Sequence, residues 1–247
     1  MDNNIKVTII TVAYNCEDTI ATAMESVLNQ TYSNIEYLVI DGFSKDNTVE
    51  IAKSYIGKFD KKGIILKVIS EPDKGMYDAL NKGVFLASGD LIGNINADDW
   101  YEPIAVEKMV ELYAKENYDL AWSDLRIIKS SGNMIKKAYV GKIWTTAGFC
   151  HPTMFSKRET LLGFPYACDQ MDDDFEMVTR VHKAGKKIVT LNEVLANYRF
   201  GGMSTTKSLK DFAKRVRMKY ATYKKHGYSP LYWFYCVAME MAKYILG

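Results

Sequence analysis

Segments typical of β-strands alternate with segments typical of amphipathic helices through the first 117 residues. The strand-like segments are 5–12, 35–41, 63–70 and 91–96. After Asp18, a plausible N-cap, one helical stripe comprises Ile20, Ala23, Met24, Val27 and Leu28. Further helices are predicted at 46–56, at 76–87 and from Pro103 onward. Because strands that alternate with helices form crossover units, the sequence predicts an α/β fold with a mainly parallel sheet and helices on both faces.

The pattern changes after residue 118. Residues 118–128 and 134–140 flank the turn-forming segment SSGN and predict a hairpin. The segment 151–156 is predicted as a short strand, 172–185 as a helix, and 187–191 and 194–200 as strands. We therefore expect one α/β domain over residues 1–205, with halves 1–117 and 118–205, followed by a helical tail over 206–247.

Polar segments follow all four predicted strands of the first half. They are AYN at 13–15, DGFSKDNT at 41–48, SEPDKGMYDALNKG at 70–83 and NADDW at 96–100. Ligands of open α/β sheets bind beyond the carboxyl ends of the strands, so these segments predict a binding site. The chain contains neither G-x-G-x-x-G after its first strand nor G-x-x-x-x-G-K-[ST], which argues against a Rossmann dinucleotide site and a P-loop.

Two adjacent acids, Asp98 and Asp99, follow the fourth predicted strand. Mg²⁺ and Mn²⁺ are commonly held by one or two carboxylates together with substrate phosphates, which makes both residues candidate metal ligands. A cation would also relieve the repulsion between the two carboxylates. The alternative is that they cap and turn the chain before the helix near Pro103.

The C-terminal segment joins a basic stretch to an aromatic one. Residues 207–226 hold eight Lys and Arg and one acid, whereas the whole chain has a net charge of +2, and we expect no nucleic-acid partner. Residues 231–239, LYWFYCVAM, are all apolar, and a helix from 231 to 247 would span roughly 25 Å, less than a ~30 Å hydrocarbon core. Residues 207–247 therefore predict an interfacial contact with an anionic membrane surface. The alternative is that the aromatic residues pack on the α/β domain.

The four cysteines indicate a reducing compartment. Cys16, Cys150, Cys168 and Cys236 show neither paired metal-ligand spacing nor a small disulfide framework. The N-terminal sequence lacks the layout of a signal peptide. We expect a cytoplasmic protein, with peripheral contact at the inner face of the cell membrane.

Several blocks, taken together and in order, are similar to one family. The blocks are TIITVAYN, SVLNQTYSNIEYLVIDGFSKDNT, SEPDKGMYDALNKG, SGDLIGNINADDWYEP, HPTMF and GGMS. From about residue 5 to 205 they resemble the inverting nucleotide-sugar glycosyltransferases of family 2, which have the GT-A (Rossmann-like) fold, and most closely the bacterial polysaccharide and O-antigen members. The resemblance makes residues 1–117 the nucleotide-sugar-binding half and 118–205 the acceptor and catalytic half.

The resemblance also implies a reaction. It implies metal-dependent, inverting transfer of a hexosyl or N-acetylhexosaminyl group, with Mn²⁺ or Mg²⁺ as the metal. The donor would be a nucleotide diphosphate sugar, with UDP as the expected nucleotide. The acceptor would be a hydroxyl group of a glycan or of a lipid-linked oligosaccharide, in the synthesis of cell-surface polysaccharide.

Roles of individual residues follow from the same resemblance. Nucleotide-sugar contacts are implied for Thr11, Ala13, Tyr14, Asn15, Asp41, Ser44, Asp73, Lys74, Asn96 and Ala97. NADD resembles the family's D-x-D metal motif, with Asp98 as the first ligand and Asp99 as the second. Asn96 stands where the first acid of that motif is often found, which leaves open which of the three residues contacts the ion.

The segment MDDDFEMVTR resembles the acidic helix start that carries the general base of the family. Inverting transfer requires a base that takes the proton of the acceptor hydroxyl. Alignment on Phe175 and Arg180 implies Asp174, with Asp173 as the alternative. Successive helical residues point about 100° apart, so three adjacent acids do not all face one site. The alternative is a structural role without catalysis, because the helix dipole alone favours acids at this position.

The three histidines of the chain have different predicted roles. His151 in HPTMF matches a family histidine on the acceptor side, where it would bind the acceptor, help to hold the metal or cap a strand end. His182 and His226 are predicted to lie at the surface.

Two other functions remain open at this point. A nucleotidyltransferase that makes sugar nucleotides would share the sheet, the nucleotide and Mg²⁺, but would be expected to carry a Gly-rich, basic loop where this chain has AYNCED. A non-catalytic glycan-assembly subunit would keep the fold and bind the donor without turnover, and would not need Asp174.

Overall fold

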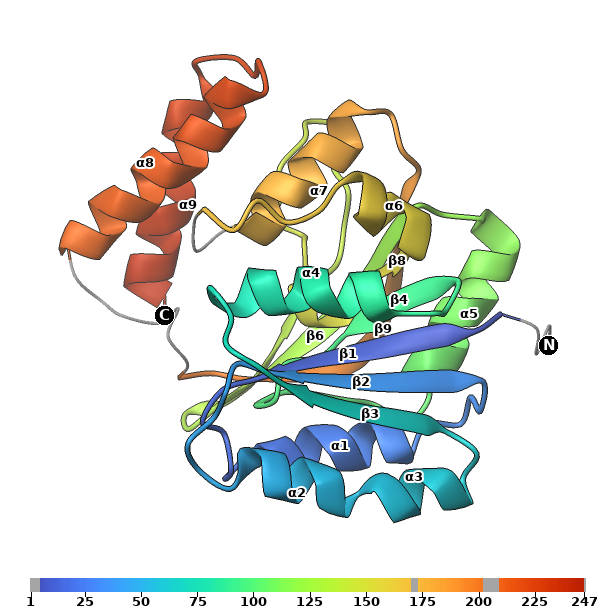
Figure 1. Cartoon of the computed structure of the whole chain (residues 1–247). Helices are drawn as coiled ribbons and strands as arrows, with labels where there is room; N and C mark the ends of the chain where they lie inside the picture. Colours follow the sequence, from blue (N-terminus) through green and yellow to red (C-terminus); the bar gives the residue numbers. More distant parts are fainter. Residues whose placement is uncertain (1–4, 170–172, 202–208, 247) are drawn as a thin grey trace.

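The strands lie in one mixed sheet (Figure 1). The computed structural model describes residues 5–169, 173–201 and 209–246. The strands are β1 (Val7–Ala13), β2 (Ile35–Asp41), β3 (Ile65–Ser70), β4 (Leu91–Asn94), β5 (Trp100–Tyr101), β6 (Leu120–Lys129), β7 (Gly132–Lys136), β8 (Phe155–Lys157) and β9 (Ile188–Arg199). The helices are α1 (Ile20–Leu28), α2 (Thr48–Ser54), α3 (Ile56–Lys61), α4 (Met76–Leu86), α5 (Ala105–Glu116), the 3-10 helix η1 (His151–Thr153), α6 (Arg158–Gly163), α7 (Asp173–Lys183), α8 (Leu209–Lys225) and α9 (Tyr232–Leu246). The order along the sheet is β3-β2-β1-β4-β8-β6-β9-β5, and β7 pairs with β6.

The first half forms the predicted parallel sheet. β1 lies between β2 and β4, β3 pairs with β2, and all four strands are parallel, so their carboxyl ends meet at one edge. Nearly every residue of β1 and β2 is buried, as expected for strands covered on both faces. Helices α1, α2 and α3 cover one face and α4 covers the other (Figure 1). Gly83 lets α4 approach the sheet, because a Cβ atom there would lie 2.7 Å from Ile10.

A buried carboxylate ties the amino ends of these strands together. Glu36 in β2 accepts hydrogen bonds from the Thr8 hydroxyl at 2.8 Å and from the N–H and hydroxyl of Ser88 at 2.8 and 2.9 Å, and it pairs with Lys67 Nζ at 3.0 Å. Burial by itself raises the pKa of Glu36, but the hydrogen bonds, that of the Ser88 N–H first, outweigh it and lower the pKa to about 2. The charged form of Glu36 therefore stabilises the turn that leads into β4.

Strand β8 joins the two halves. It is antiparallel to β4 on one side and to β6 on the other, while β6 and β9 are parallel. The predicted hairpin is present as β6 and β7. The two predicted halves therefore share one continuous sheet.

Several element boundaries differ from the prediction. The helix predicted at 46–56 is two helices, α2 and α3, and α1 has Thr19 as its N-cap instead of Asp18. The strand predicted at 151–156 begins as η1, because Pro152 has no N–H to donate to a sheet, and β8 starts only at Phe155. The strands predicted at 187–191 and 194–200 are the single strand β9. The sequence did not predict β5 or α6.

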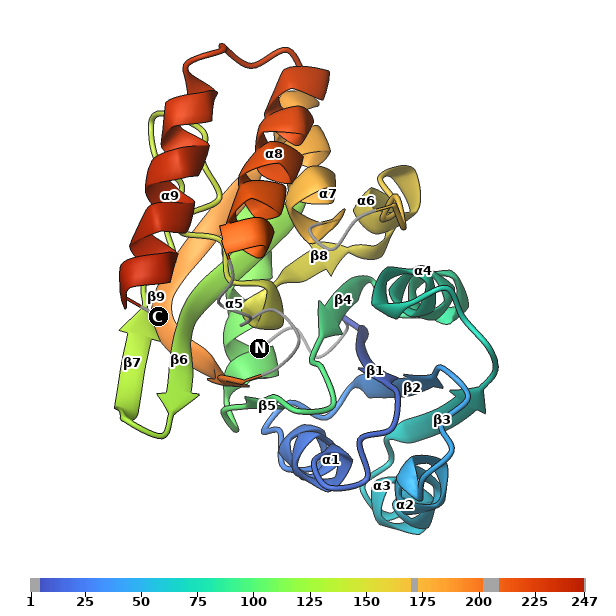
Figure 2. The same ribbon diagram turned by 90° about the vertical axis from the view of Figure 1, so that its left-hand side faces the viewer.

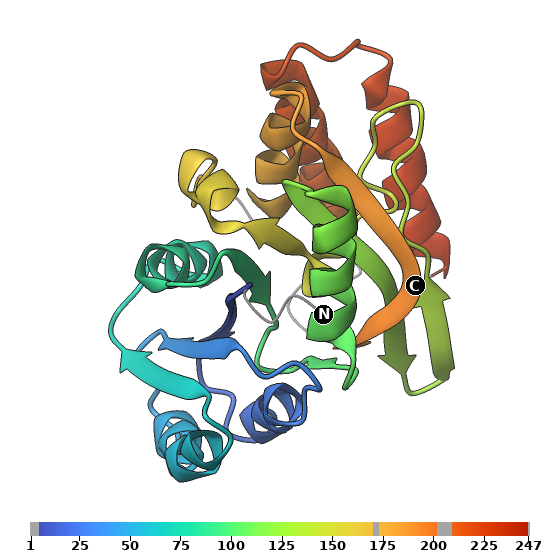
Figure 3. The same ribbon diagram turned by 90° about the vertical axis from the view of Figure 1, so that its right-hand side faces the viewer.

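The predicted C-terminal helices are α8 and α9. They pack beside α7 in the second half, away from α1, α2 and α3 (Figures 2 and 3). Tyr223 of α8 meets Phe175 of α7 edge to face, with ring centroids 5.0 Å apart, and the Tyr232 hydroxyl donates to the carbonyl of Trp144 at 2.9 Å. The alternative that residues of the aromatic stretch pack on the α/β domain is therefore confirmed for part of that stretch, including Tyr232 and the buried Cys236. No helix in the described ranges is long and apolar enough to cross a membrane.

The prediction that His182 and His226 lie at the surface is wrong in part, because both side chains are half-buried and make contacts within the protein. His182 stacks on Trp144 with ring centroids 3.8 Å apart, and its Nδ1 lies 3.0 Å from the Tyr228 hydroxyl. His226 Nε2 lies 3.0 Å from Glu176 Oε1. Both histidines connect α7 with the C-terminal segment, a contact that no local pattern in the sequence indicates.

Candidate active site

Side-chain hydrogen bonds hold the loops after β1, β2 and β3 together. Asp41, at the end of β2, is fully buried and accepts from the Ser44 N–H at 3.0 Å, from the Ser44 hydroxyl and from the Ser70 hydroxyl at 2.6 Å. Ser44 Oγ accepts from the N–H of Asn15 at 2.8 Å, and Asn15 Oδ1 accepts from the N–H of Lys45 at 2.8 Å. The structure thus brings together Asn15, Asp41 and Ser44 at the carboxyl edge of the sheet.

The loop after β3 joins the same edge. A Cβ atom at Gly42 would lie 2.7 Å from Asp73 Oδ2, so the glycine allows Asp73 to approach the loop after β2. Asp73 Oδ1 accepts from the N–H of Gly75 at 2.8 Å, and Lys74 between them is exposed. The carbonyl of Ala13 accepts from the N–H of Gly42 at 2.9 Å. Ala13, Asp73 and Lys74 therefore border one surface.

Two residues near the end of β1 differ in accessibility. The side chain of Tyr14 is 64% exposed and is free to contact a ligand. Thr11 is fully buried, and its hydroxyl lies 2.9 Å from that of Tyr37. Because the Thr11 side chain is fully buried, the predicted nucleotide contact does not fit it.

The two adjacent acids after β4 have different surroundings. Asp99 is fully buried, and its carboxylate accepts from the N–H of Arg199 at 3.0 Å and from Asn96 Nδ2 at 3.4 Å. Burial, and then the charge of Asp98, raise the pKa of Asp99 to about 8. Ala97 is buried, whereas Asp98 is partly exposed. Because burial favours the neutral form of Asp99, the repulsion between the two acids is reduced near pH 7. The buried Asp99 fits a supporting role better than the predicted role of second metal ligand.

Three other groups lie around this turn. Asn96 Oδ1 is buried and has no hydrogen-bond partner within the described chain. Arg199 Nε lies 3.4 Å from the carbonyl oxygen of Asp98, and the guanidinium lies 5.4 Å from the ring centroid of Trp100. An unpaired amide oxygen near a partly exposed carboxylate offers hard oxygen ligands, so these residues fit Mg²⁺ or Mn²⁺ bound together with a substrate. Over the described ranges, no three His, Cys, Asp or Glu residues are grouped so that they could hold a metal ion alone.

Asp174, near the start of α7, lies beside residues from both halves. The hydroxyl of Tyr77 in α4 donates to Asp174 Oδ1 at 3.1 Å, and His151 Nδ1 lies 4.0 Å from Asp174 Oδ2. The rings of Tyr77 and Tyr166 stack with centroids 5.2 Å apart. The Asp174 side chain is 22% exposed, so its carboxylate remains accessible to a hydroxyl group from outside.

His151 links Asp174 to the end of β4. Its Nε2 lies 3.3 Å from Asn94 Nδ2, and Asn94 is the last residue of β4. Because an amide nitrogen only donates, Nε2 is the acceptor and Nδ1 carries the ring proton toward Asp174. Burial lowers the pKa of His151, and the nearby Asp174 carboxylate opposes this shift. The imidazole is therefore neutral near pH 7.

The alternative base, Asp173, has a different environment. It is almost fully buried, and its Oδ2 accepts from the N–H of Asp169 at 2.7 Å. Asp172 lies outside the described residues. The geometry therefore favours Asp174, which combines accessibility with the contacts to Tyr77 and His151.

Reasoning from the sequence did not single out Tyr77, Asn94 or Arg199. Tyr77 and Asn94 fall inside the family-like blocks, but nothing in the sequence separates them from structural residues. They are recognised as neighbours of the candidate site only through contacts over long sequence separations, such as the 97 positions from Tyr77 to Asp174.

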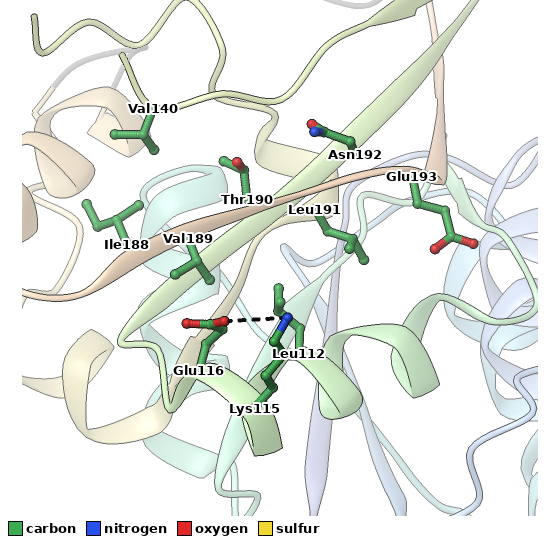
Figure 4. A pocket seen from close by; sticks show the side chains of 10 residues that line it. All are labelled: Leu112, Lys115, Glu116, Val140, Ile188, Val189, Thr190, Leu191, Asn192 and Glu193. Carbon is green, nitrogen blue, oxygen red and sulfur yellow. Dashed lines mark ion pairs between the residues drawn. The ribbon is translucent and has the colours of Figure 1, made fainter. Parts of the chain in front are cut away.

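A surface hollow of about 650 Å³ lies between α5 and β9. Figure 4 shows its lining, in which Leu112, Lys115 and Glu116 of α5 face residues 188–193. Lys115 Nζ lies 3.9 Å from Glu116 Oε1. None of the predicted site residues lines this hollow, so it is separate from the candidate site.

The sequence matches the family described as Glycosyl transferase family 2 over residues 8–168, which include the strand ends and His151. The chain belongs to glycosyl transferase family 2. It is 30% identical over 235 residues to the chondroitin synthase of Escherichia coli, an alignment that covers 89% of this family 2 chain and 33% of the synthase. This chain therefore spans about a third of the length of that relative.

Solved structures share the fold of this family 2 protein. S. aureus TarS 1–349 in complex with UDP-GlcNAc superposes with a TM-score of 0.74 at 16% identity, covering 98% of this chain and 73% of TarS 1–349. The mannosyltransferase PcManGT from Pyrobaculum calidifontis, in complex with GDP-Man and Mn²⁺, gives a TM-score of 0.68 at 18% identity, covering 98% and 75%. At these identities the likeness shows the fold, which is the GT-A fold predicted from the resemblance.

Proposed function

We propose that this family 2 protein is a metal-dependent, inverting glycosyltransferase. It moves a hexosyl or N-acetylhexosaminyl group from a nucleotide diphosphate sugar, with UDP as the nucleotide, to a hydroxyl of a glycan or lipid-linked oligosaccharide in the synthesis of cell-surface polysaccharide such as O-antigen. The observation that carries the proposal is the placement of Asp174, which is accessible, hydrogen-bonded to Tyr77, and connected through His151 to the carboxyl end of β4. The nucleotide sugars bound by the two structural neighbours support the same class of donor.

The joined loops after β1, β2 and β3 would hold the nucleotide. Tyr14 is exposed at this edge and offers a face on which a base can stack. Asp41 and Ser44 fix the shape of the edge through their hydrogen bonds with each other and with Asn15. Lys74, exposed beside Asp73, supplies positive charge for the nucleotide.

The turn after β4 would hold the diphosphate. Asp98 is the proposed metal ligand, and the unpaired Asn96 Oδ1 is a second candidate oxygen. When bound there, Mn²⁺ or Mg²⁺ would offset the charge of the departing nucleotide diphosphate. Arg199, beside Asp98, adds a fixed positive charge to the same region.

Asp174 would act as the general base. It takes the proton of the acceptor hydroxyl, whose oxygen bonds to the anomeric carbon as the bond from that carbon to the diphosphate oxygen breaks. A single displacement of this kind inverts the anomeric configuration. Tyr77 holds one oxygen of Asp174, which leaves the second oxygen for the acceptor, on the side of His151.

The proposed place of action is the cytoplasm at the inner face of the cell membrane. Lipid-linked acceptors lie in that membrane, and residues 207–247 are the part of the chain proposed to contact its anionic surface. A free glycan acceptor would not require this contact.

The test is a screen of UDP-, GDP- and TDP-sugars with Mn²⁺, with and without a lipid-linked acceptor, that measures the nucleotide product. Release of nucleotide diphosphate that depends on acceptor supports transfer, and Asp174→Asn should lower its rate about 10²- to 10⁴-fold while donor binding persists. Release of pyrophosphate would indicate the nucleotidyltransferase instead, and donor binding without turnover would indicate a non-catalytic subunit. A product that retains the anomeric configuration of the donor would reject the inverting mechanism.

A further inference from the structure

The α8–α9 helix pair has an outer face that the rest of the described protein does not cover. The two helices are antiparallel, since Tyr223 packs on Tyr232 while Arg215 pairs with Glu240 at 2.8 Å. They form the layer nearest the viewer in Figure 2, with α7 behind α8. The outer faces of both helices therefore point away from the sheet.

The outer face of α9 is apolar. Phe234 and Met241 of α9 are 69% and 53% exposed, and Ala238 between them is also exposed. Leu231, in the turn just before the helix, is 70% exposed. The spacing of these residues by three and four positions places them on one side of the helix. Glu240 lies on the opposite side and is fully buried. Isolated exposed apolar residues are ordinary, but a continuous row of them marks an interaction surface.

The outer face of α8 is basic. Lys214, Arg217 and Lys224 are exposed and recur at helical spacing, so they also share one side. Arg215 and Lys219 instead turn inward and pair with the buried Glu240. Among the basic side chains that the structure describes here, Arg215 and Lys219 are inward structural partners, Lys225 pairs with Glu176 at 3.3 Å, and Lys214, Arg217 and Lys224 form an outward row.

We propose that this outer face docks on an anionic phospholipid surface. The apolar row of α9 enters the boundary between headgroups and acyl chains, and the basic row of α8 contacts the lipid phosphates. Charge argues against a second copy of this chain as the occupant, because a symmetric contact would place the basic row opposite either another basic row or the apolar row of α9, whereas Glu240 is buried and supplies no acid on this face. The inference deepens the proposed function, on which its biological meaning rests, by naming the surface that meets the membrane.

Docking at this face has a consequence for the candidate site. Helix α7 carries Asp174, and it is joined to the helix pair through Phe175 against Tyr223 and through Glu176, which His226 approaches to 3.0 Å. The docked pair therefore holds the catalytic half close to the membrane, where a lipid-linked acceptor would be located.

The experiment is flotation of the purified full chain with vesicles of phosphatidylcholine alone and of phosphatidylcholine with phosphatidylglycerol. The protein should float with the anionic vesicles only, and salt should weaken the association. Replacement of Lys214, Arg217 and Lys224 by Glu should weaken binding by on the order of 100-fold or more, and Phe234→Ser by on the order of 10-fold. Phe85→Ser is the matched control, since Phe85 on α4 is 74% exposed and lies outside this face.

Several results would overturn the inference. The wild-type chain could stay unbound with both kinds of vesicle, or the variants of the outer face could float as the wild type does. A dimer in light scattering that Phe234→Ser dissociates would assign the face to a second copy instead. Flotation uses neither donor nor acceptor, so it tests the membrane contact alone. A protein that floats with anionic vesicles but releases no nucleotide diphosphate would support this inference and refute the proposed function.

Discussion

Replacing Tyr77 by phenylalanine removes a single hydroxyl from the candidate site. That hydroxyl donates to Asp174 Oδ1 at 3.1 Å, while the ring of Tyr77 stacks on Tyr166 and is itself almost buried. Phenylalanine keeps the ring and its packing, so the substitution tests the hydrogen bond and not the volume. If Asp174 is the base, the loss leaves Asp174 Oδ1 with the N–H of Phe175 at 2.7 Å, so the carboxylate keeps one donor but is held less firmly in the orientation that faces the acceptor.

The expected magnitude follows from the exposure of Asp174. A hydrogen bond to a charged group contributes about 1.5–3 kcal/mol. Because the Asp174 side chain is 22% exposed, water replaces part of the lost contact, which favours the lower limit. About 1.4 kcal/mol corresponds to a tenfold change in rate, so Tyr77→Phe should lower kcat about tenfold and leave the KM of the donor nearly unchanged.

The assay is acceptor-dependent release of nucleotide diphosphate, with thermal melting measured in parallel. Tyr118→Phe is the matched control, because it removes a buried hydroxyl that bonds to the carbonyl of Met109 at 3.1 Å and lies outside the candidate site. That control should lower stability by about 1 kcal/mol and leave kcat unchanged. A wild-type kcat in Tyr77→Phe refutes the reasoning, and so does an undiminished tenfold loss when Tyr77→Phe is added to Asp174→Asn, since the two residues would then act independently.

Two further predictions concern the metal and the buried acid of β2. Asp98→Ala should abolish transfer and weaken metal-dependent UDP binding, and full activity in EDTA would contradict the proposed cation. Glu36→Gln should lower the free energy of unfolding by up to about 3 kcal/mol at pH 7 and by about 1 kcal/mol near pH 3, because the folded pKa of Glu36 is about 2 against an ordinary 4.5. This stabilisation is complete above pH 4.5 and is lost as the pH falls through 2, so denaturant unfolding that gave the same difference at both pH values would reject it.

Much of the fold was predictable because its signals are local. The β-branched runs at β1 and β2 and the apolar stripe of α1 each predict an element within a few residues of its observed bounds. Parallel pairing then follows from the alternation of these elements. The prediction fails where tertiary contacts determine the secondary structure. The two residues of β5 form a strand only by pairing with Asn197 and Ala196 of β9.

The candidate site was predictable as a set of residues but not as an arrangement. The sequence placed Asp41, Ser44 and Asn15 at strand ends, and the structure joins them by hydrogen bonds. It did not indicate that Thr11 faces the interior, where its hydroxyl meets that of Tyr37. Successive residues of a strand point to opposite faces, and the covering elements decide which faces are accessible.

The sequence by itself determined the class of fold, the edge of the sheet at which a ligand is proposed to bind, and the presence of a basic and aromatic C-terminal segment. These follow from the periodicity and composition of each segment and from the order of the segments along the chain, which can all be read without knowing the tertiary contacts. Only the tertiary structure decided that Asp99 is buried against the backbone of Arg199, and that Asp174 is the acid held by Tyr77. The same is true of the tail, where packing on α7 selects which side chains are covered and which remain on the outer face. The physical reason is that burial and hydrogen bonding depend on partners that lie far away in sequence, so neighbouring residues of the same type acquire different chemistry.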